Sequence, residues 1–133
     1  MNTPAFENLD LACAKAGKTI AKKPSKELEN IVTDALAVLE EQGLYALFLY
    51  LEKAVSGTEK KKMAEKISLE LNEFLKKTPQ QFPLLPDNTE IFASFQQIAN
   101  NLDNLLLARD LVRQTLVYAR YHARVPQKSE VSA

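Results

Sequence analysis

Residues 28–55 read LENIVTDALAVLEEQGLYALFLYLEKAV, and this segment is the clearest indication of a helical fold. In its first half the apolar residues recur every three or four positions, which is the spacing of one face of an α-helix. Gly43 stands where that helix should end. Residues 44–55 are apolar on nearly every side, as expected of a short helix at the centre of a bundle. We therefore predict two consecutive helices joined at Gly43.

Apolar residues with helical spacing are also found before residue 28. Thr3 and Pro4 suit the cap and the first position of a helix that ends before Pro24, and Ser25 is suited to begin the next helix. The apolar stripe of this first helix consists of Phe6, Leu9, Cys13, Ala16 and Ile20. The sequence thus predicts a helix on either side of Pro24.

Downstream, a fourth helix is expected over residues 59–77. The segment 78–87 carries three prolines and is expected to be a loop. The loop residues expected to be held against the bundle are Phe82, Leu84 and Leu85.

The C-terminal third contains two apolar faces that disagree in phase. One helix is expected to begin at Asp87, which forms a capping-box pattern with Glu90. From Leu105 onward the apolar residues lie about half a turn away from the face of that helix. One continuous helix would bury arginines, so we predict a break within residues 100–104, where Asn and Asp can cap a new helix.

These elements predict an all-α protein, a compact bundle of about six helices. The chain has 133 residues, of which 46% are hydrophobic and 26% are charged. That size suits one helical domain spanning residues 1–133, because such a chain buries roughly 68–70% of its unfolded surface without disulfides. Residues 1–3 and 126–133 are expected to be flexible.

Composition excludes several classes of protein. Seventeen basic and seventeen acidic residues give a net charge of zero, which argues against a globally polybasic nucleic-acid binder but not against a local basic patch. The single cysteine cannot form an internal disulfide, and the first residues lack the features of a signal peptide, so we expect a cytoplasmic location. The most apolar stretch, residues 43–51, is far shorter than the ~20 residues of a membrane span.

The residues suited to catalysis are few. His122 is the only histidine and has no cysteine or carboxylate nearby in the sequence that would orient it as a catalyst or metal ligand. Cys13 falls on an apolar stripe, where cysteine behaves as a small hydrophobic residue. Glu40 and Glu41 are adjacent on a helix and diverge by about 100°. We therefore expect no enzymatic activity, no metal site and no cofactor.

The basic residues are more informative. The only four arginines of the chain lie on its last helix, and their spacing places them within an arc of about 60°. This arginine row consists of Arg109, Arg113, Arg120 and Arg124. Arginine is preferred for bidentate recognition of phosphate, and Tyr121 beside the row could stack a base. A second basic face is expected on the first helix, at Lys15, Lys18 and Lys22.

Two interpretations of the arginine row remain open. The row could contact RNA phosphates or a partner protein, or it could be a solvated face that pairs with acidic neighbours such as Glu40 and Glu41. The acidic and basic residues also fall on different helices, so copies of the chain could stack on one another and present their basic faces to a phosphate chain.

The sequence resembles one known family. The stretch 28–55 resembles the small α-helical subunit of type III-B (Cmr module) CRISPR effector complexes, in which a helix ends in an Asn-Gly-Leu turn before a second, apolar helix. Here the turn is Gln42-Gly43-Leu44, with glutamine in place of asparagine. The segment QTLVYARYHARV resembles the closing basic-aromatic helix of the family, with tyrosine where tryptophan is usual. The equivalent small subunit of a related type III system fits equally well.

The resemblance implies a non-catalytic subunit that is present in several copies. Such copies line the crRNA-bound filament and brace the guide–target RNA through phosphate contacts, beside other effector subunits. The arginine row and the three lysines are the residues expected to contact crRNA and target RNA. The alternative is a helical interaction or dimerisation adaptor with no nucleic-acid role and no membrane association.

Overall fold

The computed structural model describes residues 7–80, 83–85, 98 and 101–125. All regular secondary structure within these ranges is helical, so the predicted all-α class is confirmed. The helices are α1 (Leu9–Ile20), α2 (Lys26–Gln42), α3 (Leu44–Leu49), α4 (Thr58–Lys77) and α6 (Leu102–Ala123). A π-helical turn, η1 (Tyr50–Ala54), continues α3 without a break. Counting α3 and η1 as one, the described residues contain five helices.

The helix ends follow from local chemistry. The Ser25 hydroxyl accepts a hydrogen bond from the Leu28 N–H at 3.0 Å and so caps α2, as the sequence predicts. Gly43 ends α2 with a φ of +98°, a conformation that costs glycine little. Asn101 accepts from the Asn104 N–H at 3.1 Å and starts α6. The break predicted within residues 100–104 is therefore confirmed.

Two expectations about the first helix are wrong. The helix begins at Leu9 and not near Pro4, because Asn8 is extended and its side chain accepts from the Leu11 N–H at 2.9 Å. It also ends at Ile20, so Lys22 follows the helix instead of standing on its face. Thr3, Pro4 and the expected flexible ends lie outside the described residues.

The expected count of six helices is one too many for the described residues. The helix expected from Asp87 falls almost wholly outside them, as do its capping residues. Of that segment only Ile98, which is buried, is described before the break. In the preceding loop Leu84 and Leu85 are buried as predicted, whereas Phe82 is not described.

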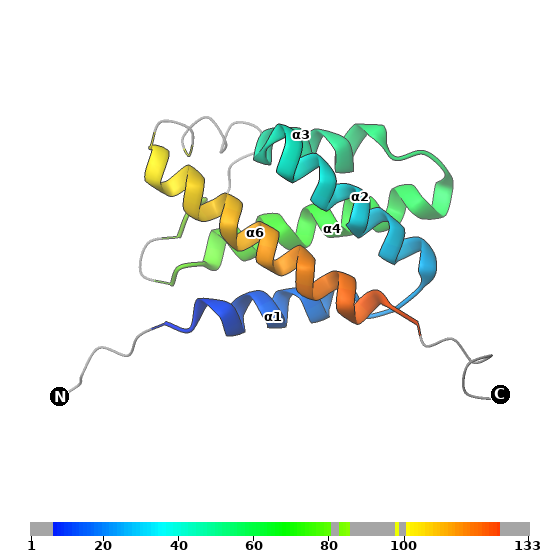
Figure 1. The fold of residues 1–133 in the computed structure, drawn as a ribbon, viewed down its shortest axis with the longest axis horizontal. Coiled ribbons are helices and arrows are strands. Elements are labelled where there is room, and N and C mark those ends of the chain that lie inside the picture. The colour runs from blue at the N-terminus through cyan, green and yellow to red at the C-terminus, as the bar shows by residue number, and fades with distance from the viewer. Residues whose placement is uncertain (1–6, 81–82, 86–97, 99–100, 126–133) are drawn as a thin grey trace.

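The bundle is organised around α1 and α2. Each of these helices contacts both α6 and α4, with α6 in front and α4 behind in Figure 1. Residues 28–55 supply much of the hydrophobic core, because Leu39, Leu47, Phe48 and Leu51 are almost fully buried. The buried face of α6 runs from Ala108 to Ala123 and matches the apolar arc read from the sequence. This packing leaves the two flanks of α6 beside α1 and α2, where the candidate residues lie.

Candidate nucleic-acid interface

The arginine row lies on the flank of α6 that faces α2. Arg109 Nη2 is 3.9 Å from Glu40 Oε2, and Arg113 Nε is 3.6 Å from Glu40 Oε1. Arg109 Nη2 also donates to the backbone carbonyl of Glu40 at 3.3 Å, in the last turn of α2. Arginine is favourable there, because the C-terminal end of a helix carries partial negative charge. One carboxylate therefore holds two guanidinium groups from adjacent turns of α6.

The other end of the row is held by a second carboxylate. Arg124 Nε lies 3.4 Å from Glu29 Oε2, and the Arg124 guanidinium stands 5.9 Å from the centre of the Tyr121 ring. The Glu29 side chain is only 13% exposed and also pairs with Lys26 at 3.6 Å. Arg120, between these clusters, makes no ion pair with the described residues. Three of the four arginines thus have carboxylate partners on α2.

Sequence reasoning named Glu40 as a pairing residue but missed Glu29. Glu29 and Glu40 are separated by 11 residues, as are Arg113 and Arg124. Because α6 runs antiparallel to α2, equal separations let both pairs form at once. The equal spacings could have indicated the second ion pair from the sequence, but only if the two helices were known to be antiparallel. The structure does not pair Glu41, the other expected partner, with any described residue.

The opposite flank of α6 packs closely against α1. A methyl group on Gly17 would lie 2.8 Å from the Ala119 nitrogen and from the Thr115 carbonyl oxygen. The Cys13 thiol donates to the Leu111 carbonyl at 3.4 Å. At the edge of this contact the Tyr118 hydroxyl donates to the Asp10 carboxylate at 2.7 Å, and this hydrogen bond raises the pKa of Tyr118. The absence of a side chain at Gly17 allows the two backbones to meet.

The three expected lysines lie on the α1 side of the molecule. Lys15, Lys18 and Lys22 are all exposed, and none of them forms an ion pair with the described residues. The structure therefore does not merge the lysines and the arginines into one patch. They form two separate basic strips, one on the flank of α6 that faces α2 and one on α1, where Lys15 also lines the groove between α1 and α4. Tyr121 is 61% exposed and lies beside Arg124 of the arginine row, where its ring could stack a base.

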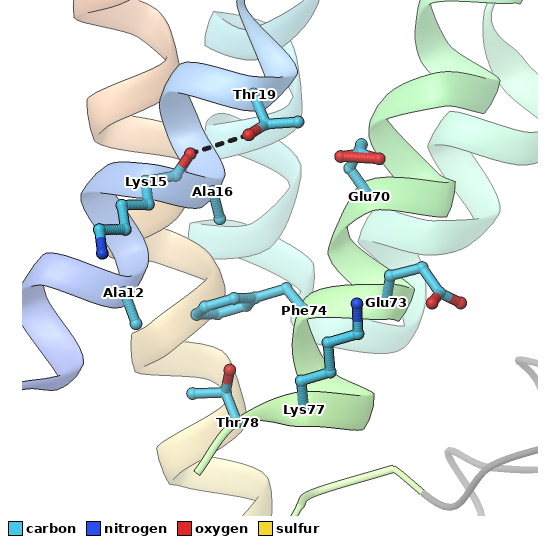
Figure 2. Close-up of a pocket in the computed structure, with 9 residues that line it drawn as sticks. All are labelled: Ala12, Lys15, Ala16, Thr19, Glu70, Glu73, Phe74, Lys77 and Thr78. Atoms are coloured by element: carbon cyan, nitrogen blue, oxygen red, sulfur yellow. Dashed lines mark hydrogen bonds between the residues drawn. The ribbon is translucent and has the colours of Figure 1, made fainter. Parts of the chain in front are cut away.

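A shallow groove lies between α1 and α4. Figure 2 shows the Phe74 ring of α4 directed toward Ala12 and Ala16 of α1, with Lys15 and Lys77 near the rim. The groove has a volume of about 450 Å³ and is also lined by Thr19, Glu70, Glu73 and Thr78. Its mixed charges favour neither an anion nor a cation. In this groove Lys15 lies beside an apolar surface.

Among the described residues, no arrangement of side chains activates either candidate for catalysis. Cys13 is buried, and burial raises the pKa of its thiol above the ordinary value of 9.0, which disfavours the reactive thiolate. His122 is exposed near the end of α6. Among the described residues no three His, Cys, Asp or Glu side chains are grouped so that they could hold a metal ion.

The raised pKa of Cys13 predicts a loss of stability in alkali. An unfolded thiol ionises as the pH rises past about 8.5–9, whereas the buried thiol stays protonated, so ionisation favours the unfolded chain. The stabilising contribution is fully present below that range and is lost as the pH rises toward the folded pKa. Urea denaturation at about pH 8 and pH 10 should show a smaller loss for Cys13→Ala than for the wild type. Equal losses would contradict this assignment.

Comparisons with protein-family models, with curated proteins and with solved structures found no match to this chain. No helix within the described residues has both the length and the apolar character needed to cross a membrane.

Proposed function

We propose that this chain is a non-catalytic small subunit of a type III CRISPR ribonucleoprotein effector and contacts RNA through backbone phosphates. The observation that carries the proposal is the arginine row on α6, three of whose side chains remain partly exposed while ion pairs hold them in place. The Arg109, Arg113 and Arg124 side chains are 37%, 47% and 61% exposed. Guanidinium groups presented in this way have N–H donors left to contact phosphate oxygens.

The two basic strips suit recognition of a nucleic-acid backbone without sequence preference. Phosphate contacts fix a strand in place but carry no base information, as expected of a subunit that braces RNA. A few such contacts are weak alone, and affinity in the complex would come from several copies bound along one guide–target RNA. Cleavage would belong to other subunits.

A protein-interaction adaptor without nucleic acid is the second candidate. It is favoured by the ion pairs that three of the arginines already form with Glu29 and Glu40. It is also favoured by the apolar side chains that α6 exposes, among them Leu106 at 48% and Leu102 at 65%. Exposed apolar residues on one helix are typical of a docking surface for another protein.

Purification of the native protein from its source cell at moderate salt separates the two functions. The proposal predicts a particle far larger than the 14.9 kDa chain, containing short guide-like RNA and several other subunits. Nuclease treatment is the control, since an adaptor complex should survive it and contain no RNA. An RNA-free monomer or dimer would contradict the proposal.

A further inference from the structure

The Glu40 carboxylate is placed between two members of the arginine row. Its Oε1 lies 3.6 Å from Arg113 Nε and its Oε2 lies 3.9 Å from Arg109 Nη2. The Glu40 side chain is 52% exposed, so solvent and solutes reach the group that the arginines share. The cluster has two positive charges and one negative charge, which leaves a surplus of one positive charge at the end of α2.

Glu40 differs in this respect from Glu29, the other carboxylate on the arginine row. The Glu29 side chain is 13% exposed and is shared between Arg124 and Lys26. Displacing Arg124 would leave this mostly buried carboxylate with only the exposed Lys26 as its ion-pair partner, which costs more than the same loss at an exposed carboxylate. An exposed ion pair contributes little and exchanges partners easily. Arg109 and Arg113 are therefore the arginines that can change partner at low cost.

We propose that Glu40 sets the affinity of the RNA site, because its carboxylate competes with RNA phosphate for Arg109 and Arg113. This inference rests on the proposed function. A guanidinium has five N–H donors, and Glu40 contacts one nitrogen of each arginine, so a phosphate can approach the remaining donors. The approaching phosphate is repelled by the negative charge of the Glu40 carboxylate. The carboxylate both spaces the two guanidinium groups and weakens their attraction for a polyanion.

The test compares Glu40→Gln with Glu41→Gln in the 133-residue chain. Both substitutions remove one negative charge from the same turn of α2, but Glu41 points about 100° away from Glu40 and forms no ion pair with the described residues. Binding of a short fluorescent single-stranded RNA of mixed sequence is measured by anisotropy at several salt concentrations. Thermal unfolding of each variant confirms that the fold is kept.

Glu40→Gln should tighten RNA binding about five-fold more than Glu41→Gln does. The Glu40 carboxylate lies 3.6 and 3.9 Å from the arginine nitrogens, and at about 4 Å the attraction between two unit charges in a water-like dielectric is about 1 kcal/mol, which corresponds to this change in affinity. It should also steepen the log–log salt dependence by about 0.7, the increment for one additional phosphate contact on a single strand. A purely structural role for Glu40 would change the unfolding temperature without steepening the salt dependence.

Equal effects of the two substitutions, or weaker RNA binding by Glu40→Gln, would overturn the inference. A double variant, Arg109→Ala with Arg113→Ala, distinguishes this failure from failure of the proposed function. If the double variant loses RNA affinity while Glu40→Gln and Glu41→Gln behave alike, only the role of Glu40 is refuted. If the double variant binds RNA as the wild type does, these arginines are not the phosphate site and both proposals fail.

Discussion

Replacing Gly17 by alanine should lower the free energy of unfolding by about 3 kcal/mol, because the added methyl group meets the backbone of α6. The new Cβ would lie 2.8 Å from the Ala119 nitrogen, from the Thr115 carbonyl oxygen and from the Tyr118 Cβ. Two of these three atoms belong to the main chain of a helix and cannot turn aside as a side chain would. The helices α1 and α6 must therefore separate, and their apolar contact is loosened along its length.

Close packing and helix propensity predict opposite signs for the stability change of Gly17→Ala. Within a helix, alanine is intrinsically more favourable than glycine by about 1 kcal/mol, so propensity alone predicts a more stable protein. Urea denaturation followed by circular dichroism measures the difference. Lys18→Ala, at the next and exposed position of α1, is the matched control and should change stability by no more than about 0.5 kcal/mol. A Gly17→Ala variant as stable as the wild type would contradict the close packing of α1 on α6.

Local rules account for most of what the sequence predicts correctly. The two ends of α2, at Ser25 and Gly43, were predictable because hydroxyl capping and a positive φ depend only on nearby backbone. The break before α6 was predictable because two apolar faces half a turn apart cannot both be buried in one straight helix. The start of α1 was mispredicted for a related reason. Thr3 and Asn8 are both acceptable caps, and local propensity does not choose between them.

Features that depend on which helices are neighbours could not be predicted in the same way. Gly17 has ordinary helical surroundings in the sequence, and its role becomes visible only once α6 lies against it. The pairing of Arg124 with Glu29 requires the antiparallel direction of α2 and α6. The sequence placed the arginine row and the lysines on two different helices, but it did not give the relative position of these two helices in the bundle. The residue types were predictable, but their arrangement follows from tertiary packing.

Replacing all four arginines of α6 by alanine should flatten the salt dependence of single-strand RNA binding by up to about 3 units of log–log slope. Each phosphate contact on a single strand contributes about 0.7 to this slope, and the row offers four guanidinium groups. The fold should survive, because the exposed ion pairs of Arg109 and Arg113 contribute no more than about 1 kcal/mol each, and Glu29 keeps Lys26 as a partner when Arg124 is removed. Circular dichroism of the variant checks this expectation.

Two further variants make the comparison specific to the row. Substituting alanine for four exposed lysines of α4 removes the same charge from another part of the bundle; these are Lys60, Lys61, Lys62 and Lys66. A variant with lysine at all four arginine positions keeps the charge but loses the planar guanidinium groups, so it should keep most of the slope and bind less tightly. Comparing the salt dependence of these variants therefore distinguishes the positive charge of the arginine row from the net charge of the protein. Comparing their affinities shows the contribution of the planar guanidinium groups.

Phosphate binding by the arginine row is tested by titrating RNA against the wild type and the four-arginine variant side by side over a range of salt concentrations. We expect the log–log slope to fall by up to about 3 units in the arginine variant and by less than about 1 unit in the α4 lysine control. An unchanged slope in the arginine variant, or an equal loss in the control, would contradict phosphate binding by the arginine row. The adaptor function would then be the better description of this chain.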